Sequence, residues 1–131
     1  MTATESQARI LVADDDEDIL NLVALTLERE GYAVIRARDG AEAVDVALHA
    51  QPDLLVLDVM MPKQDGFAVI RALRGEISTE TTPILLLTAS VQEHHRERGL
   101  DAGADAFVRK PFSPRELLGE IRRLLDLRRS P

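Results

Sequence analysis

Five acidic side chains stand in a row at residues 14–18, directly after the apolar run 10–13. Acidic groups at the start of a helix are each favoured by about 0.3–1 kcal/mol through the helix dipole and the unsatisfied N–H groups. Helix capping explains the last three acids in this way, but it needs neither Asp14 nor Asp15. Two carboxylates about 4 Å apart repel each other by about 4 kcal/mol at an effective dielectric constant near 20, so a proton or a cation must offset the charge of this pair.

A third carboxylate, that of Asp58, follows the apolar run 54–57. Taken alone, an aspartate in this position is usually a turn residue. Together with Asp14 and Asp15 it could form an all-oxygen site with no His or Cys nearby in the sequence, which suits Mg²⁺ or Mn²⁺ rather than zinc. Three carboxylates do not complete an octahedron, so we expect water or the oxygens of a phosphate-bearing substrate in the remaining positions.

Two further polar residues, Thr88 and Lys110, follow apolar runs. Thr88 could be a helix N-cap, but Ser90 and Glu93 already form an S-x-x-E capping pattern without it. Lys110 could be a surface residue that happens to precede a proline, yet lysine is the rarer choice in a chain with two Lys among sixteen basic residues. A compact ammonium can enter a small anionic site where a planar guanidinium would not fit. The bond to Pro111 can be cis or trans, and the sequence leaves both isomers open.

The spacing of apolar residues predicts the elements that position these side chains. Five short apolar runs predict strands buried on both faces, at 9–13, 32–37, 53–57, 84–87 and 106–108. Segments with apolar spacings of three and four predict helices between them, at 18–30, 41–50, 67–74, 91–102 and 115–127. This alternation predicts an α/β fold, a doubly wound parallel sheet with helices on both faces. Ligands of such sheets bind outside the carboxyl ends of the strands, which is where the five polar residues are expected.

Composition narrows the classes of function. A chain of 131 residues that is 45% hydrophobic fits one domain, expected over 9–127 between a flexible N-terminal segment 1–8 and a tail or linker stump 128–131. The net charge of -7 argues against direct nucleic-acid binding and against an anionic membrane as partner. The absence of cysteine excludes disulfides and thiolate chemistry, and no apolar run approaches the roughly 18 residues of a membrane span. A cytoplasmic location is the expectation.

Six short segments carry a family resemblance through their order and spacing. They read I-L-V-A-D-D at 10–15, L-L-V-L-D-V-M-M-P at 54–62, D-G-F at 65–67, I-L-L-L-T-A at 84–89, G-A-D-A-F-V-R-K-P-F at 103–112 and S-P-R-E-L-L at 113–118. Each is weak alone, but together they are highly specific. From residue 9 to 127 the chain resembles the receiver domain of bacterial two-component response regulators. The resemblance implies a flavodoxin-like (βα)5 fold with a five-stranded parallel sheet in the order 2-1-3-4-5.

The resemblance also implies a role for each acidic residue of the site. It makes Asp58 the phospho-acceptor, and it assigns the binding of Mg²⁺, with Mn²⁺ as the alternative, to Asp15, Asp58 and the backbone carbonyl of Met60. Asp14 would hold a metal-bound water. The donor would be a sensor histidine kinase, a phosphotransfer protein or a small acyl phosphate. Loss of the group to water would reset the switch without turnover of an external substrate.

The remaining implied roles concern the phosphoryl group and the signal. Thr88, Ala89 and Lys110 would bind the phosphoryl group. Thr88 would then move toward it and Phe107 would turn inward behind it, in a shift between two preexisting conformations. Many relatives carry tyrosine in place of Phe107, so this chain lacks that hydroxyl for the readout.

The surface expected to respond is formed by segments 91–102, 106–108 and 115–127. An unknown downstream protein or output domain would read it. Some relatives that bind DNA dimerise through this surface, but here Ala106 replaces an acidic residue common in that interface, so a homodimer is one hypothesis only.

Two other functions compete with the switch. A phosphatase of the haloacid dehalogenase type also uses an aspartate nucleophile with Mg²⁺, but it needs a second acid two residues later, where this chain has Met60. A degenerate receiver or a flavodoxin-like nucleotide carrier is disfavoured because all five receiver positions are present and no G-x-G-x-x-G follows the first strand.

Overall fold

Five strands alternate with five helices in the computed structural model of the chain, which describes residues 7–61, 65–89 and 93–129. The elements are β1 (Arg9–Ala13), α2 (Glu17–Arg29), β2 (Ala33–Ala37), α3 (Gly40–Ala50), β3 (Leu54–Asp58), α4 (Gly66–Arg74), β4 (Ile84–Thr88), α5 (Glu93–Ala102), β5 (Ala106–Arg109) and α6 (Pro114–Arg129). Each lies within two residues of the segment that apolar spacing predicts. The alternation expected from the sequence is therefore confirmed.

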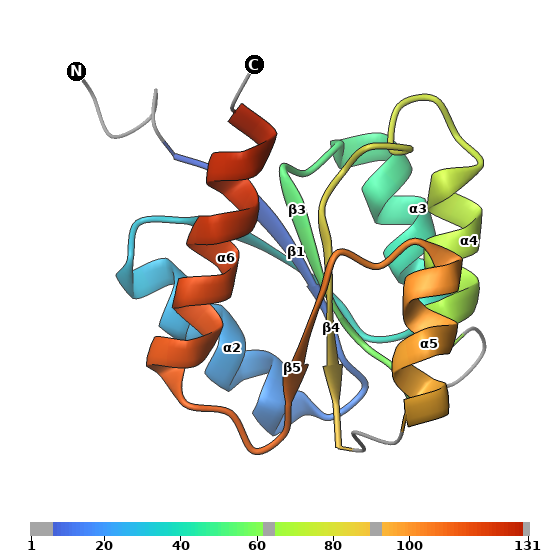
Figure 1. Ribbon diagram of the computed structural model, residues 1–131. Helices are drawn as coiled ribbons and strands as arrows, with labels where there is room; N and C mark the ends of the chain where they lie inside the picture. The colour runs from blue at the N-terminus through green and yellow to red at the C-terminus, as the bar shows by residue number, and fades with distance from the viewer. Residues whose placement is uncertain (1–6, 62–64, 90–92, 130–131) are drawn as a thin grey trace.

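The strands form one parallel sheet in the order β2-β1-β3-β4-β5. Helices α2 and α6 cover one face, while α3, α4 and α5 cover the other (Figure 1). The flavodoxin-like strand order implied by the family resemblance is confirmed. Because all strands run the same way, their carboxyl ends share one edge of the sheet.

Each face of the sheet has its own apolar core, because successive side chains of a strand point to opposite faces. Val12 and Val56 join the core beneath α2 and α6. Leu11 and Leu57 join the core beneath α3 and α4. With both faces covered, the central strands read as unbroken apolar runs rather than alternating ones.

Local capping starts several helices at the positions that the sequence indicates. The Asp16 carboxylate accepts hydrogen bonds from the backbone N–H groups of Asp18 and Ile19. Ser113 Oγ likewise accepts from Glu116 N, at 3.0 Å. Such caps each contribute about 0.5–2 kcal/mol, so the third acid of the run 14–18 has a structural role. The capping pattern at Ser90 lies outside the described residues.

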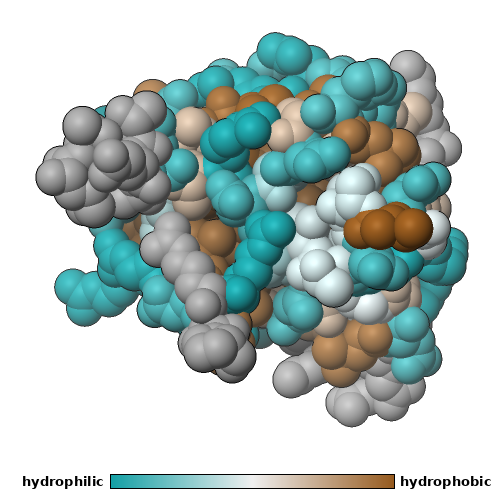
Figure 2. All heavy atoms as spheres, turned by 90° about the horizontal axis from the view of Figure 1, so that it is seen from above, coloured by the Kyte–Doolittle hydropathy of each residue, from teal (hydrophilic) through white to brown (hydrophobic). Residues whose placement is uncertain are grey.

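The end of the molecule at which the strands begin is largely polar. Figure 2 views this end and shows hydrophilic residues over most of it, with smaller hydrophobic areas between them. Within the described residues, no helix is long and apolar enough to cross a membrane. The opposite end, where the strands finish, carries the residues that could do chemistry.

Candidate functional site

The three aspartates predicted to converge lie together at the carboxyl ends of β1 and β3. Ala13 pairs with Leu57 in the parallel ladder, so the residues that follow, Asp14 and Asp58, come side by side. One carboxylate oxygen from each of Asp14, Asp15 and Asp58 lies within 4.8 Å of the others. Asp14 and Asp58 are buried and Asp15 is exposed, so the cluster reaches solvent at Asp15.

Lys110 projects into this cluster from the end of β5. Its Nζ lies 3.2 Å from Asp14 Oδ2 and 3.2 Å from Asp58 Oδ1. Its backbone N–H donates to the Thr88 carbonyl at 2.7 Å, which holds Lys110 to the neighbouring strand β4. The Lys110–Pro111 bond, left open by the sequence, is cis. One ammonium thus faces two buried carboxylates, and with Asp15 beside them the cluster keeps an excess of negative charge.

The two buried carboxylates have different surroundings. Asp14 is 1% exposed, and its two oxygens accept from Asp16 N at 2.9 Å and from Lys110 Nζ at 3.2 Å. Asp58 is 7% exposed, and its Oδ1 accepts from Met60 N at 3.4 Å. Asp14 is therefore held on both oxygens by the protein. Asp58, at the end of its strand, is the more accessible of the two.

Burial and charge shift the pKa of both Asp58 and Lys110. Burial raises the pKa of the Asp58 carboxyl from 3.8 to about 6, and the nearby Asp14 carboxylate adds to the rise; Lys110 and the Met60 N–H partly oppose it. For Lys110, burial favours the neutral form, but the attraction of Asp58 and Asp14 outweighs it and raises the Lys110 pKa above its ordinary value. Lys110 thus stays charged at neutral pH, but its charge does not fully offset the free-energy cost of ionising the buried Asp58.

The donor set fits a hard divalent cation. Carboxylate oxygens are the ligands that Mg²⁺ prefers, and it is usually held by one or two carboxylates together with water and phosphate oxygens. Asp15 and Asp58 can supply such oxygens within the 4.8 Å cluster. The raised pKa of Asp58 also indicates a site that lacks positive charge.

Gly66, which the sequence analysis placed only within the D-G-F motif, supports the position of Asp58. A Cβ atom on Gly66 would lie 2.7 Å from the Asp58 carbonyl oxygen and 3.1 Å from Val59 Cα. Gly66 N also donates to the Val59 carbonyl at 2.9 Å. The start of α4 therefore approaches the end of β3 as closely as backbone atoms allow. The sequence feature that could have predicted this close approach is the aspartate–glycine pair at the start of the predicted helix 67–74.

The other predicted site residues surround the cluster. Thr88 ends β4 and is 5% exposed, while Ala89 follows it at the surface. Met60 is 73% exposed beside Asp58. Phe107 is half-buried on β5 and packs into the core beneath α3 and α4. The structure thus places Thr88, Ala89 and Met60 at the same edge of the sheet as the carboxylates, whereas Phe107 lies further along β5.

An apolar groove of about 370 Å³ adjoins the site. Lys110 and Ala89 form part of its lining, and α2 and the segment after β5 complete it with Ile19, Leu22, Pro111 and Phe112. Leu22 is 53% exposed. Exposed aliphatic side chains next to a charged site are typical of a protein-binding surface.

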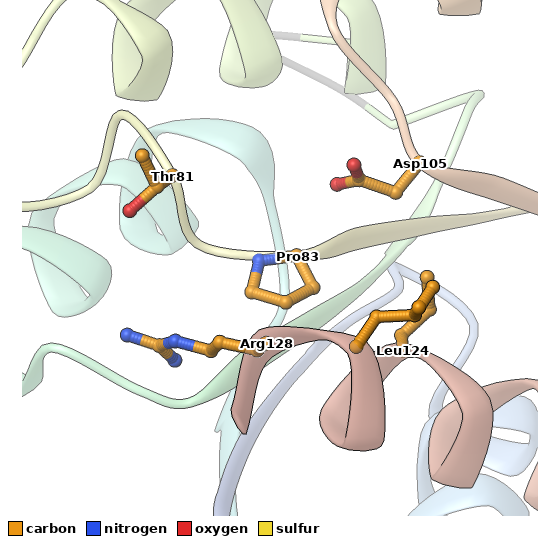
Figure 3. A pocket seen from close by; sticks show the side chains of 6 residues that line it. Thr81, Pro83, Asp105, Leu124 and Arg128 are labelled. Carbon is orange, nitrogen blue, oxygen red and sulfur yellow. The ribbon is translucent and has the colours of Figure 1, made fainter. Parts of the chain in front are cut away.

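A second cavity, of about 420 Å³, lies away from the carboxylates. Its lining comes from the start of β4 and β5 and the end of α6 (Figure 3). The charged groups there are already engaged: Asp105 accepts from Ile84 N at 2.8 Å and from Arg74, and Arg128 donates to the Asp53 carbonyl. This cavity therefore offers a substrate little unsatisfied polar chemistry.

Arg74 is a structural residue that the sequence analysis did not single out. Its guanidinium donates to the carbonyls of Gly103 and Thr82 at 2.8 and 2.7 Å and pairs with Asp105 at 2.9 Å. It joins the end of α4 to the loop before β4 and to the turn before β5. The sequence did not predict this role, because Arg74 is one of fourteen arginines and no local motif distinguishes it.

Comparison with known proteins decides the family. The family described as the response regulator receiver domain matches residues 10–122. The chain belongs to this family. The family resemblance seen in the sequence motifs is thereby confirmed.

The chain is similar to curated transcriptional regulatory proteins. It is 48% identical to the alkaline phosphatase synthesis regulator PhoP of Bacillus subtilis, over 89% of this chain and 48% of PhoP. It is 47% identical to CpxR of Escherichia coli, over 89% of this chain and 49% of CpxR. The chain thus spans about half the length of these relatives.

Solved structures give the same fold. The chemotaxis protein CheY4 of Vibrio cholerae aligns with a TM-score of 0.87 at 36% identity, covering 90% of this chain and 98% of CheY4. The receiver domain of the sensor histidine kinase PA1611 of Pseudomonas aeruginosa aligns with a TM-score of 0.86 at 29% identity, over 92% of this chain and 98% of that domain. The latter structure has a magnesium ion coordinated in its active-site cleft.

Proposed function

We propose that this receiver domain is a phosphorylation-activated switch in which Asp58 accepts a phosphoryl group. The observation that carries the proposal is the position of Lys110 Nζ, 3.2 Å from both Asp14 and Asp58 within a cluster of three carboxylates. An ammonium in this position favours anionic oxygens that arrive beside Asp58. Membership of the receiver family supports the same function.

In this proposal Asp15, Asp58 and the Met60 backbone carbonyl hold Mg²⁺, or alternatively Mn²⁺. Asp14, whose two oxygens accept from Asp16 N and Lys110, contributes through a metal-bound water. When bound, the ion offsets the repulsion between the anionic nucleophile and the anionic phosphoryl group. The magnesium ion in the cleft of the related PA1611 receiver domain supports this assignment.

The covalent step is a phosphoryl transfer onto a carboxylate. An Asp58 oxygen forms a bond to phosphorus while the bond between phosphorus and the donor's histidine nitrogen breaks, and that nitrogen keeps the electron pair. Thr88, Ala89 and Lys110 bind the phosphoryl oxygens. Attack by water later breaks the acyl phosphate and regenerates the Asp58 carboxylate, so the domain resets itself.

The proposed donor is a sensor histidine kinase or a phosphotransfer protein. The apolar groove beside Lys110 supports a protein donor, because Ile19 and Leu22 can pack against apolar side chains that flank the phosphohistidine. A small acyl phosphate such as acetyl phosphate needs no such contact and can serve as an alternative donor. The two kinds of donor can therefore be separated by substitutions in the groove.

The proposed output is a change of the surface formed by α5, β5 and α6, set by Thr88 and Phe107. A downstream protein or an output domain reads this change. The names of PhoP and CpxR, both transcriptional regulatory proteins, support control of transcription through another module rather than nucleic-acid binding by this domain. A homodimer through the same surface is a second candidate, tested by comparing elution volumes in size-exclusion chromatography before and after phosphorylation.

The decisive experiment is incubation with acetyl phosphate followed by intact-mass analysis. We expect one added phosphoryl group in the presence of Mg²⁺ and none without metal. Asp58→Asn removes the acceptor and should abolish the modification. The matched control Asp101→Asn, an exposed aspartate on α5, should be modified like the wild type. Equal modification of Asp58→Asn and the wild type would refute Asp58 as the acceptor.

A further inference from the structure

Helix α5 contains a buried glycine against which the Phe107 ring lies. A Cβ atom on Gly99 would lie 2.4 Å from Phe107 Cζ, 2.9 Å from Cε1 and 3.0 Å from Leu86 Cδ1. Real Cβ atoms do not approach other atoms to 2.4 Å, so no side chain fits at residue 99 while the ring holds this position. The missing side chain of Gly99 forms a notch, and the tip of the Phe107 ring fills it.

Backbone conformation does not explain this glycine. Gly31 and Gly103 have positive φ angles, but Gly99 does not, so alanine could adopt its backbone conformation. Glycine also disfavours a helix interior relative to alanine. By contrast, a Cβ on Gly119 of α6 would meet nothing within 4 Å. What distinguishes Gly99 from Gly119 is the contact with Phe107.

The notch lies on the same face of the sheet as Thr88. Leu86 pairs with Phe107 in the ladder between β4 and β5, and paired residues of parallel strands point to the same face. Thr88 stands two residues after Leu86 and therefore points to that face as well. A movement of Thr88 or Phe107 thus acts on the layer that contains α5.

Helix α5 has few apolar anchors among the side chains that the structure describes. Of residues 98–102, Gly99 is buried, Ala102 is partly buried against the core beneath α3 and α4, and Leu100 is 50% exposed. Arg98 lies over the Phe67 ring at 4.5 Å and ties the helix to α4. The contact between Gly99 and Phe107 ties it to β5. The Phe107 ring is therefore one of the described contacts that hold α5 on the sheet.

We infer that Gly99 is the positioning residue of the switch, because its notch is the inward seat of Phe107 and couples this ring to helix α5. The role of the ring in signalling rests on the proposed function, whereas the seat itself rests on the contact distances alone. In Gly99→Ala the ring must leave the seat or α5 must move outward. Either change should weaken the response of α5 to phosphorylation of Asp58.

The test compares Gly99→Ala with the matched control Gly119→Ala. Protein labelled with ¹³C in its phenylalanine rings and leucine methyl groups reports contacts between the Phe107 ring and the Leu86 methyls by nuclear Overhauser effects. We expect these contacts in the wild type and in Gly119→Ala, and their loss in Gly99→Ala. Addition of beryllofluoride with Mg²⁺, a stable mimic of the acyl phosphate, should shift the backbone amide signals of residues 98–102, and this response should fall by more than half in Gly99→Ala.

A second variant keeps the inference testable if Gly99→Ala folds poorly. Phe107→Leu shortens the side chain that fills the notch, so Gly99→Ala should lower the urea unfolding midpoint in the wild type but change it little in the Phe107→Leu background. Equal losses in both backgrounds, or failure of the double variant to fold, would overturn the inference. So would unchanged Phe107–Leu86 contacts and an unchanged α5 response in Gly99→Ala.

The experiments distinguish a wrong inference about Gly99 from a wrong proposed function. Intact-mass analysis after acetyl phosphate treatment should find one phosphoryl group on Gly99→Ala, because the substitution leaves the carboxylates in place. If the wild type takes up no phosphoryl group, the proposed function fails. The ring contacts and the unfolding midpoints then still decide whether Gly99 seats Phe107.

Discussion

Replacement of Asp58 by asparagine should stabilise the metal-free protein. The folded protein holds the Asp58 pKa at about 6, against 3.8 for the ordinary carboxyl, chiefly through burial and then through Asp14. An ionised Asp58 therefore destabilises the folded state at neutral pH. The difference between the two pKa values corresponds to about 3 kcal/mol, and solvent screening at the open side of the site lowers this to about 1–3 kcal/mol. Asparagine has nearly the same shape and carries no charge, so Asp58→Asn should recover this free energy of unfolding.

The pH dependence has a definite sign. Because the folded-state pKa lies above the unfolded one, the destabilisation is absent below about pH 3.8 and complete above about pH 6. The advantage of Asp58→Asn should therefore be full at about pH 7.5 and fall below about 1 kcal/mol at about pH 4. Added Mg²⁺ should stabilise the wild type more than the variant and so narrow the gap at neutral pH.

Urea unfolding followed by circular dichroism, in a chelator-containing buffer, measures this free energy. Asp101→Asn removes one negative charge from an exposed site and should change stability by less than about 0.5 kcal/mol. The reasoning is refuted if Asp58→Asn is no more stable than the wild type at neutral pH without metal. A gain of equal size in acid, near the ordinary carboxyl pKa, would also show that ionisation of the buried Asp58 is not its cause.

Three further predictions concern the same edge of the sheet. Mg²⁺ affinity by titration calorimetry should fall about tenfold between about pH 7 and about pH 5, because protons compete at Asp58 with its pKa of about 6; a constant affinity would exclude Asp58 as a ligand. Leu22→Asp in the apolar groove should slow transfer from a phosphorylated histidine kinase but not from acetyl phosphate, whereas Leu127→Asp, on the distant end of α6, should leave both rates unchanged. Gly66→Ala should cost about 1–3 kcal/mol in urea unfolding, since its Cβ would meet backbone atoms 2.7 Å away, while Gly119→Ala should not destabilise.

Much of the fold could be predicted because its signals are local. Strands buried on both faces read as short apolar runs, and the helices between them show spacings of three and four. Caps act within about three residues, so the sequence by itself marks Asp16 and Ser113 as helix starts. Strand order has no such local signal. The alternation of strands and helices predicts a parallel sheet, whereas the order of its strands was predicted from the family resemblance.

The site was predictable in composition but not in geometry. An excess of carboxylates that helix capping could not explain predicted a cation site, and the rarity of lysine in a chain with two Lys and fourteen Arg pointed to Lys110. Its contact with Asp14 spans 96 positions of the chain, and its 3.2 Å distance follows from strand order and register. Contacts of this kind depend on how the sheet is assembled, and no window of neighbouring residues contains them.

By itself, the sequence determined to within two residues where the strands and helices lie, and it determined which unusual charges needed a partner. Tertiary structure alone decided that Arg74 joins three segments, that Gly66 approaches Asp58, and that Gly99 receives the Phe107 ring. The physical reason is range. Helix propensity, capping and alternation act over a few residues. A notch between side chains, a salt bridge between distant residues or a pKa shifted by their charges exists only after packing has brought distant segments within a few ångströms.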